Sequence, residues 1–490
     1  MGATELFVRR DVWSLEASDP WDTVTIGYAK AVAEMQARPA DDPTSWIYQA
    51  AMHGTYADVP PGAVWNQCQH ASWFFLSWHR MYTYWFERIA RKVAVSQGGP
   101  TDWALPYWNY SVGGQANTLP PAFRSPTWRV NGTDAPNPLY TTHRAPGIND
   151  GAGLLPRQTS FAYAFSFTNF TDLPTPSFGG GRAPATHFSH FTGALENQPH
   201  NIVHDLVGGP GDGECEQGWM SDPNCAAQDP IFWLHHANID RLWTNWLTQG
   251  GGRADPTDRA WLATPFTFYD ENGTQVTMTA ADILDTVIQL RYRYDDHLPP
   301  VTTRLRDLIA VNMPPPSSPQ DPPRLIATSD DGVTLTGQPT SLTVPLPATA
   351  QNTVAALAAG DRPGRLSLNV EGIQVPKPPG VVYEVHLNLP PDVDPTTDNT
   401  FFVGQISFFG SGHHEPGQHP DTHQAGLSHT FDITGLVQLL YAQHHWDPQQ
   451  ATITFIPVGL TPPPGNPGSA YDTEPTTTPR VARISLSSTP

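Results

Sequence analysis

Histidines recur in the first half of the chain at spacings that suit a metal site. His200 and His204, in PHNIVHDL, are four residues apart, so a helix would place both imidazoles on one face. His70 and His79 are nine residues apart; at roughly 100° per residue this is about 900° of helical rotation. A straight helix cannot aim both at one metal, so we expect His70 in a loop and His79 in the helix that follows.

Two further segments complete the set of histidines. His53, in AAMHGTYAD, is expected at the end of a preceding helix, where it would join His70 and His79. The segment QDPIFWLHHANIDRLW supplies His235 or His236, and spacing alone does not choose between them. Its Asp240 is i,i+4 to the second of the pair, so the carboxylate is expected beside that imidazole as a supporting group.

The count is three plus three: His53, His70 and His79, then His200, His204 and one member of the adjacent pair. Each motif alone is also explained by surface or structural histidines, but several together favour metal binding. An all-imidazole site without carboxylate or thiolate suits copper or zinc, and copper binds more strongly. A structural zinc would favour four ligands, with cysteine among them.

Helical periodicity predicts the elements that hold these groups. The stretch 19–38 starts with a cap-like Asp followed by Pro, and 71–93 is long, aromatic-rich and ends in basic residues. Further helices are expected over 200–206, 230–247 and 281–292.

The character of the chain changes after the Pro-rich segment 314–323, PPPSSPQDPP. Short runs rich in Val, Ile, Thr and Phe follow, most of them bounded by Gly, Pro or Asn. They are SLTVPL, GRLSLNV, VVYEVHLNL, FFVGQISFF, SHTFDIT, ATITFIP and VARISLS. This number of strands at this spacing predicts an antiparallel sandwich or barrel.

Length and charge limit the classes of function. The 490 residues indicate two domains. A net charge of −20 argues against nucleic acid or an anionic membrane as a partner. The first residues, MGATELFVRRDVW, lack the apolar core of a signal peptide, and no apolar run reaches the length of a membrane helix. We therefore expect a cytoplasmic protein, with export alongside a partner protein as the alternative.

The histidine motifs resemble those of the type 3 dicopper family, which comprises tyrosinases, plant polyphenol oxidases (catechol oxidases) and molluscan hemocyanins. The stretch from His70 through FLSWHR to Glu87 is similar to the first copper signature of the family, and DPIFWLHHANID is similar to the second. The resemblance implies that His236 is the copper ligand. It also implies that His235 is a structural neighbour.

The chain has only three cysteines, which excludes a disulfide framework and leaves at least one for another use. The segment Cys68-Gln69-His70 resembles the Cys-X-His element in which a thioether joins cysteine to a copper-ligating histidine. The alternative is that Cys68 is an ordinary buried thiol. Under the resemblance, Cys215 and Cys225 are free or bridged to each other.

The resemblance extends over most of the chain. VEGIQV, FVGQISFFG, SHTFDIT and ATITFIPVG are similar to the C-terminal domain of plant polyphenol oxidases and hemocyanins, a β-sandwich that covers the active-site entrance. It implies a mainly α catalytic domain over 1–310, with a four-helix bundle around the dicopper site and long loops. A Pro-rich linker over 311–340 and a β-sandwich domain over 341–490 would follow.

Two short motifs look like boundary elements of the family's catalytic domain. They are VRRDV near the start of the chain and YRY at 292–294. Arg9 or Arg10 stacking on Tyr292 or Tyr294 would tie the ends of this domain together.

For function, the resemblance implies a tyrosinase with two copper ions and O2 as co-substrate, which hydroxylates small monophenols and oxidises o-diphenols to o-quinones. Glu196 resembles a glutamate that holds a water near the site, and Asn201 an asparagine that helps this water act as a base. The alternative for Glu196 is a solvated helix-start carboxylate. Asp205 is at a position that varies with substrate choice in the family; its charge would favour amine-bearing phenols, unless it is a plain surface charge.

Other functions and regions stay open at this point. A catechol oxidase or o-aminophenol oxidase without monophenol hydroxylation, and a hemocyanin-like oxygen carrier, are the alternatives. A homo-oligomer is compatible with the sequence. The Gly-rich loop 208–218 and the insertion 147–182 are expected to rim the entrance. A last group of histidines forms an accessory metal site or, as we favour, a polar loop: His413, His414, His419, His423 and His429.

Overall fold

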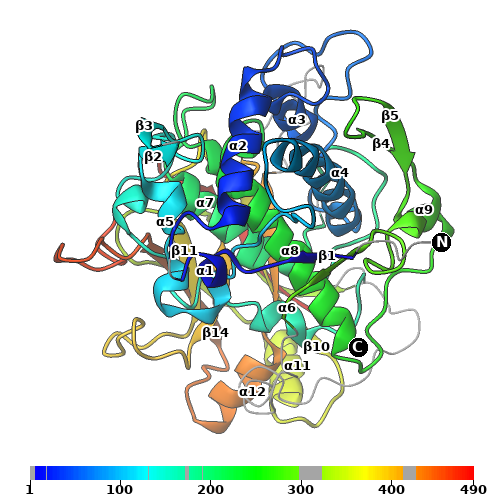
Figure 1. The fold of residues 1–490 in the computed structure, drawn as a ribbon. Coiled ribbons are helices and arrows are strands. Elements are labelled where there is room, and N and C mark those ends of the chain that lie inside the picture. Colours follow the sequence, from blue (N-terminus) through cyan, green and yellow to red (C-terminus); the bar gives the residue numbers. More distant parts are fainter. Residues whose placement is uncertain are drawn as a thin grey trace.

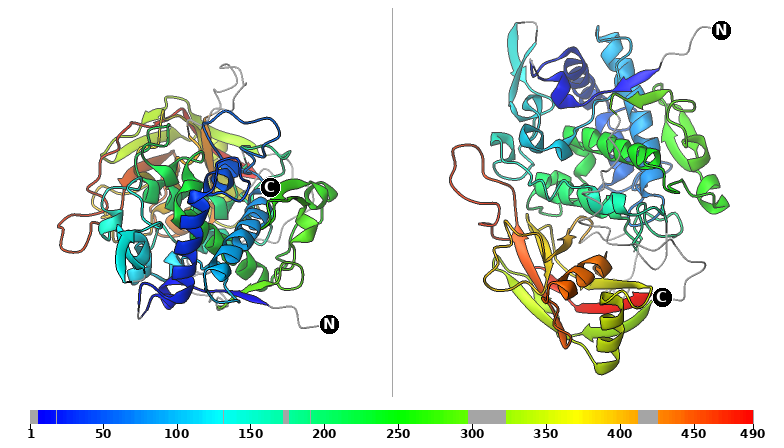
Figure 2. Two further views of the ribbon diagram at one scale, coloured as in Figure 1. Left: turned by 45° about the horizontal axis from the view of Figure 1, so that its top comes forward. Right: turned by 90° about the horizontal axis from the view of Figure 1, so that it is seen from below.

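The computed structural model describes residues 6–17, 19–130, 132–171, 176–189, 191–296, 323–411 and 426–489. They form a helical part up to residue 296 and a β-rich part from residue 323, each with its own main hydrophobic cluster. Figure 1 and the right-hand view of Figure 2 show the helical part, blue to green, stacked on the β-rich part, yellow to red.

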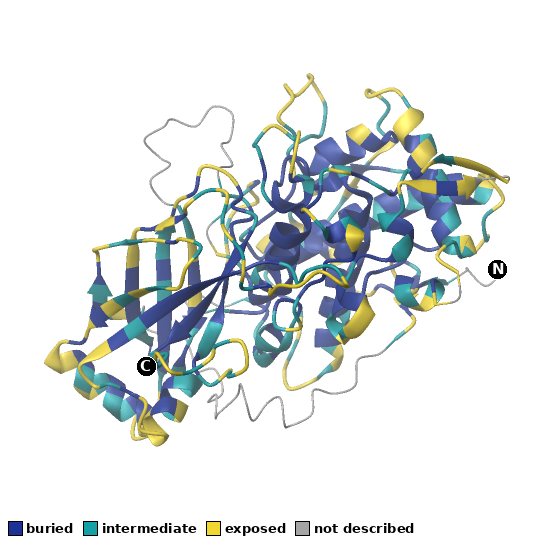
Figure 3. Ribbon diagram, turned by 90° about the vertical axis from the view of Figure 1, so that its left-hand side faces the viewer, coloured by how far each residue is buried: buried dark blue, intermediate teal, exposed yellow. Residues whose placement is uncertain are grey.

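Four helices form the centre of the helical part: α2 (Thr23–Ala37), α4 (Phe75–Ser96), α7 (Ile202–Gly208) and α8 (Pro230–Thr248). The carboxylates of Asp22 and Asp229 cap α2 and α8 by accepting backbone N–H groups of the first turn. Helix α4 packs against both α2 and α8. The middle of the helical part is almost wholly buried (Figure 3), so the predicted helical domain is confirmed.

Shorter elements complete this part. Strand β1 pairs in parallel with β6, while β2–β3 and β4–β5 are antiparallel pairs. Their bounds are α1 (Val12–Leu15), α3 (Trp46–His53), α5 (Pro121–Arg124), α6 (Ala162–Ser166), α9 (Arg259–Ala263), β1 (Phe7–Arg9), β2 (Thr127–Val130), β3 (Thr133–Pro136), β4 (Phe266–Tyr269), β5 (Gln275–Met278) and β6 (Tyr292–Tyr294).

The predicted helix over 281–292 is wrong. This segment holds a single 3-10 turn (Ala280–Asp282), then irregular turns and strand β6. Leu284, Val287 and Ile288 are exposed, at 38%, 40% and 73%, so a helix here would lack most of the packing that supplies a helix's stability. The Asp285 carboxylate accepts backbone N–H groups from Val287 and Ile288, which favours a turn.

Arg9 joins the two ends of the helical part, as predicted. Its guanidinium lies over the Tyr292 ring, 3.8 Å from the centroid, and donates to Glu87 Oε2 at 2.6 Å and Asp240 Oδ2 at 3.1 Å. Asp240 also accepts from Arg80, at 2.5 Å. The predicted support of His236 by Asp240 is therefore wrong, because two buried guanidinium groups take up the carboxylate.

The β-rich part is a sandwich of two four-stranded sheets, with strand orders β13-β10-β16-β7 and β12-β11-β14-β9. Apolar residues of the two sheets share one core, so the predicted β-sandwich is confirmed. The strands are β7 (Arg324–Ser329), β9 (Thr340–Pro345), β10 (Arg365–Ile373), β11 (Val382–Leu387), β12 (Phe402–Ile406), β13 (Leu427–Asp432), β14 (Gln450–Val458) and β16 (Arg483–Thr489); β8 (Val333–Thr334) pairs with β15 (Arg480–Val481) outside the sheets.

The structure differs from the sequence prediction at the start of the sandwich. The predicted linker 311–340 contains β7, which pairs with β16 inside a sheet, so its second half, from Arg324 on, belongs to the sandwich. The alternation in RLIATS is the pattern of a strand, and the adjacent prolines obscured it. Helices α11 (Ala348–Ala358) and α12 (Thr434–Ala442) also lie in this part and pack on each other.

Of the C-terminal histidine group, only His429 is among the described residues. It is buried in β13, and its Nε2 donates to the carbonyl of Ser407 at 3.2 Å. His413, His414, His419 and His423 lie outside the described residues, so the preference for a polar loop stays a prediction.

Several contacts join the helical and β-rich parts. Gly153 forms a backbone bridge with Thr461, and Pro210, in the predicted rim segment 208–218, forms one with Pro379. Arg157 donates to the buried Glu384 of β11 at 2.6 Å. Within the described part of the chain, none of the helices has the length and apolar character needed to cross a membrane.

Candidate metal centre

The first histidine triad is gathered from a helix end, a loop and a helix. His53 is the last residue of α3, and His79 lies in the second turn of α4. His70 lies in the preceding loop, where its backbone N–H donates to the carbonyl of His187 at 3.1 Å. The ring centroids are 5.2 Å apart for His53 and His70, 5.5 Å for His53 and His79, and 5.1 Å for His70 and His79.

The second triad comes from two consecutive helical segments and α8. His200 lies in the irregular turn Glu196–Asn201, His204 on α7 and His236 on α8. Their ring centroids are 4.5 Å apart for His200 and His204, 4.9 Å for His200 and His236, and 5.5 Å for His204 and His236. Two groups of three imidazoles therefore lie side by side.

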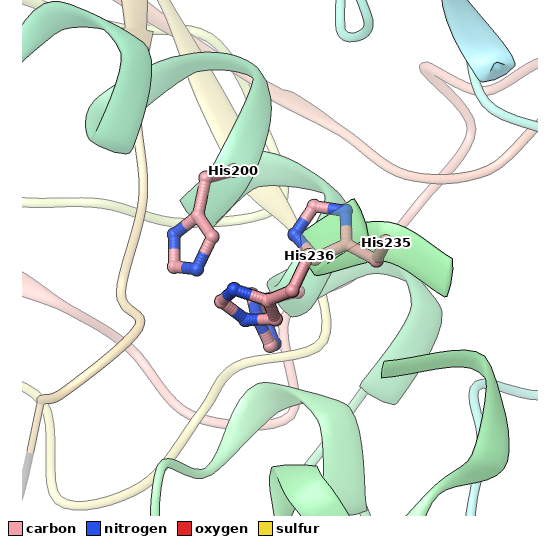
Figure 4. A group of neighbouring side chains, drawn as sticks. His200, His235 and His236 are labelled. Atoms are coloured by element: carbon pink, nitrogen blue, oxygen red, sulfur yellow. The ribbon is translucent and has the colours of Figure 1, made fainter. Parts of the chain in front are cut away.

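His236 lies where the two triads meet. Its ring stacks on His79 of the first triad, with centroids 4.5 Å apart, and its Nε2 is 3.3 Å from Nε2 of His204. Its neighbour His235 contacts the rings of His200 and His204, while its Nδ1 is hydrogen-bonded to the Tyr110 hydroxyl at 3.1 Å. Figure 4 shows His200, His235 and His236 around the same space, the last two from adjacent positions of α8.

The potential ligand atoms form overlapping groups within 4.8 Å of one another. One group holds His53, Cys68 and His70, and another holds His53, His79 and His236. A third group holds His200, His204, His235 and His236. The Nε2 atoms of His70, His79 and His200 are buried and have no hydrogen-bond partner among the described residues. Buried imidazole nitrogens of this kind are satisfied by a metal ion, so the residues fit a dinuclear centre.

Hydrogen bonds at Nδ1 fix which ring nitrogen is left for a metal. His53 donates to the carbonyl of Pro223 at 2.8 Å, His79 to that of Phe75 at 2.8 Å and His204 to that of Met220 at 2.7 Å. Because a carbonyl oxygen only accepts, Nδ1 carries the proton and Nε2 carries the lone pair.

Burial keeps these imidazoles neutral. Loss of hydration lowers the pKa of His200 to about 3 and lowers the pKa of His70, His79, His204 and His236 well below the ordinary value. Neighbouring histidines lower the pKa of these last four further, since each would repel a second positive charge. Neutral imidazole is the form that binds a metal.

Cys68 is a buried thiol that lies against the first triad. Its Sγ is 3.2 Å from Nδ1 of His70 and 3.1 Å from Nδ1 of His187. The pair Cys68 and His70, which the resemblance joins by a thioether, is therefore in contact. The other two cysteines, Cys215 and Cys225, are bridged, which settles the pairing that the sequence left open.

Glu196 and Asn201 both lie at the second triad. Glu196 is buried, and its Oε1 accepts the backbone N–H of Ala71 at 2.7 Å, so it also touches the loop of His70. Burial raises the pKa of Glu196 to about 8. Asn201 accepts a hydrogen bond from Nδ1 of His200 at 2.7 Å, so it orients this ring.

The sandwich inserts a side chain between the histidines. Phe409, just beyond β12, stacks on His204 with centroids 4.2 Å apart and lies 5.5 Å from His70 and 5.6 Å from His200. The Asp205 carboxylate accepts the backbone N–H of Phe408 at 2.8 Å. Asp205 is thus buried rather than exposed, and it holds the inserted segment in place.

Sequence reasoning missed Phe409 and the aromatic ring of Phe188, which stacks on His70 with centroids 4.8 Å apart. The motif FVGQISFFG marked the strand before Phe409, but nothing in its pattern indicates that this last Phe leaves the sandwich core while Phe408 stays in it. It also missed the carbonyls of Met220 and Pro223, because backbone acceptors leave no trace in side-chain patterns.

Comparison with protein-family models agrees with the site. Residues 43–249 match the common central domain of tyrosinase, and residues 255–306 match the polyphenol oxidase middle domain. Residues 322–463 match a domain family of unknown function, DUF7868.

Similar proteins extend this match over the whole chain. Tyrosinase HcTyr1 of Hahella sp. (strain CCB-MM4) is 33% identical over 487 residues, covering 92% of this chain and 95% of that protein. The latent form of polyphenol oxidase from Prunus armeniaca is 36% identical over 295 residues, covering 55% of this chain but only 46% of that protein. The solved structure of latent apple tyrosinase shares the fold, with a TM-score of 0.61 at 23% identity over 99% of this chain and 98% of that one.

The chain therefore belongs to the tyrosinase and polyphenol oxidase family of type 3 copper proteins. Enzymes of this family are copper oxidoreductases that act on phenols at a dicopper centre. The recognition made from the histidine motifs is confirmed, together with the fold class.

The predicted cytoplasmic location is corrected by the comparisons. The relatives from Prunus armeniaca, Vicia faba and Vitis vinifera are named as chloroplastic enzymes. The bridge between Cys215 and Cys225 also departs from what is usual in cytosolic proteins, since disulfides persist in oxidising compartments. The lack of an apolar signal-peptide core in the first residues does not suffice to assign a cytoplasmic location.

Proposed function

We propose that this chain is a tyrosinase that hydroxylates small monophenols and oxidises the resulting o-diphenols to o-quinones, with O2 as co-substrate. One copper ion would be held by His53, His70 and His79, and the second by His200, His204 and His236. The observation that carries the proposal is the pair of adjacent triads of buried imidazoles. The similarity to a tyrosinase over nearly the whole chain supports the same activity.

The copper pair, when bound, would supply the redox chemistry that activates O2 towards a phenol. The chain's own residues position the phenol and handle its proton. A buried aromatic setting, with Phe188 beside His70 and Phe232 beside His236, excludes water and favours a planar ring. Above a pH of about 8, where it is ionised, Glu196 would accept the phenolic proton through a water held beside Asn201, since its Oε2 has no hydrogen-bond partner among the described residues.

Cys68 is proposed to form a thioether with His70, in which an S–C bond replaces the thiol S–H and one ring C–H, and O2, the proposed co-substrate, takes up the two electrons and two protons. The contact between Sγ and the ring supports this bond, which would hold an imidazole that otherwise lies in a loop. Mass spectrometry of the peptide pair that contains both residues, with a loss of two hydrogens expected, tests it.

The sandwich is proposed to keep the enzyme latent. Phe409 lies over the second triad where a substrate ring would stack on His204, and Asp205 anchors its backbone. Once the sandwich is displaced, the Asp205 carboxylate would be released to face amine-bearing phenols. The relative from Prunus armeniaca that is named a latent form supports this arrangement.

Oxygen uptake by the copper-loaded full chain tests the proposed function. Tyramine and its matching diphenol, dopamine, are compared before and after mild proteolysis. Uptake with tyramine supports a tyrosinase. Uptake with dopamine alone assigns a catechol oxidase, and uptake with neither, despite two bound copper ions and complete displacement of the sandwich, assigns an oxygen carrier.

Glu196→Gln separates the two activities. The neutral amide cannot take the phenolic proton, so we expect the turnover of tyramine to fall about 100-fold while dopamine oxidation stays near the wild-type rate. Oxidation of the diphenol does not depend on a general base of this kind, whereas hydroxylation of the monophenol does. Turnover of both substrates and copper content are measured on the proteolysed enzyme.

Glu16→Gln is the matched control for this variant. Glu16 is also buried with a pKa raised to about 8 by burial, but its carboxylate contacts Thr25 and the backbone of Ala122. It should leave both activities unchanged. Equal losses of tyramine and dopamine turnover in Glu196→Gln would show that Glu196 only supports the site's structure.

A further inference from the structure

The segment between Cys215 and Cys225 touches both histidine triads. Met220 accepts the Nδ1 hydrogen of His204, at 2.7 Å, and Pro223 accepts that of His53, at 2.8 Å. Both acceptors lie inside the ten-residue separation that the disulfide closes. One short loop therefore orients one imidazole from each proposed copper site.

Two other triad histidines, His79 and His200, are oriented at Nδ1 by a group of their own segment. His79 donates to the carbonyl of Phe75 one turn earlier in α4, and His200 donates to the side chain of Asn201 next to it. His53 depends on a carbonyl 170 residues away in the sequence. Its orientation is therefore set by how the loop is placed, and the fold of α3 alone does not fix it.

Glycines let the loop approach both helices. Gly54 directly follows His53, and a Cβ there would lie 2.6 Å from the Pro223 carbonyl oxygen. Gly208 ends α7, the helix of His204, and a Cβ there would lie 2.1 Å from the backbone nitrogen of Ser221. Such distances exclude any side chain, so backbone packs directly on backbone at both histidine-bearing helices.

Further bonds hold the loop in one shape. The Tyr56 hydroxyl donates to Asp222 at 2.6 Å, and the same carboxylate accepts the Asn224 backbone N–H at 2.9 Å. Residues 220–225 are all buried, whereas Cys215 is only partly buried. The bridge thus joins a packed half of the loop to a half that reaches the surface.

We infer that the disulfide loop 215–225 is a positioning element for the dicopper centre, which holds His53 and His204 with Nε2 turned inward, and that opening its bridge weakens copper retention in both triads. This inference rests on the proposed function for the identity of the metal. Lost partners of metal-binding histidines typically lower metal affinity by about 10- to 100-fold.

The test compares the full-length wild type with Cys215→Ser/Cys225→Ser, which opens the loop without adding thiols. Both are loaded with Cu(I) without oxygen and challenged with bicinchoninate. We expect the double variant to lose copper about 10- to 100-fold faster than the wild type, for the first and for the second copper ion released. The cobalt(II) forms add a second readout, because a turned imidazole shifts the visible ligand-field bands.

Val32→Ala controls for a general loss of stability. Val32 is fully buried in α2, a helix that holds no triad histidine and no residue of the loop, so we expect the variant to lower the unfolding temperature of the apoprotein and leave the histidines in place. Copper release from Val32→Ala should match the wild type. The inference is overturned if the serine variant releases copper no faster than Val32→Ala, or if its cobalt spectrum is that of the wild type.

Two safeguards keep the outcome interpretable. If the serine variant does not fold, the apo wild type is reduced without oxygen, freed of reductant and then compared in its open and bridged forms. A wild type that retains no copper contradicts the proposed centre itself and, with it, the inference. A wild type with two copper ions that are held equally well in both loop states contradicts the inference alone.

Discussion

Phe409→Ala should activate the intact chain without proteolysis or detergent. The Phe409 ring stacks on His204 and is almost fully buried, at 4% exposure, so it fills the space that a phenol ring needs. Removing the ring opens this space while the sandwich stays attached. We expect kcat/KM for dopamine to rise roughly tenfold or more, because the fraction of molecules with an open site limits the activity of the wild type.

Phe401→Ala is the control for Phe409→Ala. Phe401 is as buried, at 2% exposure, but packs within the sandwich core, where its ring contacts His445. It should destabilise the sandwich without opening the site. If both variants are activated equally, loosening of the sandwich is the cause and the plug assignment fails. An unchanged kcat/KM in Phe409→Ala, with two copper ions bound, would also reject it.

Local patterns predicted the part of the site that depends on helical phase. The i,i+4 spacing of His200 and His204 and the half-turn mismatch of His70 and His79 are properties of the helix itself. Both pairs come together as predicted, but His200 lies in the irregular turn just before α7. The strands of the sandwich were equally visible, because alternating apolar residues mark one buried face.

The parts that were missed depend on contacts between distant segments. Asp240 was expected beside His236, four residues away, but Arg9, 231 residues away in the sequence, takes its carboxylate. A buried positive charge gains more from a carboxylate than a neutral imidazole does. Phe409 belongs to a strand motif whose partner surface lies in the other part of the chain, so its local pattern could not reveal the insertion.

The adjacent histidines of α8 give a paired prediction for copper binding. His236→Gln should reduce the copper content from about two ions to about one per chain and abolish phenol oxidation, because three ligands around an open position are what a catalytic site of this kind requires. His235→Gln should keep about two copper ions, since a Tyr110 hydroxyl that donates to Nδ1 of His235 leaves the proton, and no lone pair, on Nε2. Copper content by atomic absorption and dopamine turnover after proteolysis are the measurements.

The pair decides between two arrangements of the second triad. The Nε2 atoms of His236 and His204 approach to 3.3 Å, as expected for lone pairs that converge on one ion, whereas a hydroxyl that donates to Nδ1 of His235 leaves the proton on Nε2 of that ring. If only His235→Gln loses copper, His235 is the copper ligand and His236 is its structural neighbour. Loss in both variants would point to a four-histidine site, since the ligand atoms of His200, His204, His235 and His236 all lie within 4.8 Å of one another. The side chains are neighbours on one helix and equally buried, so a difference in copper content would reflect ligand geometry and not burial.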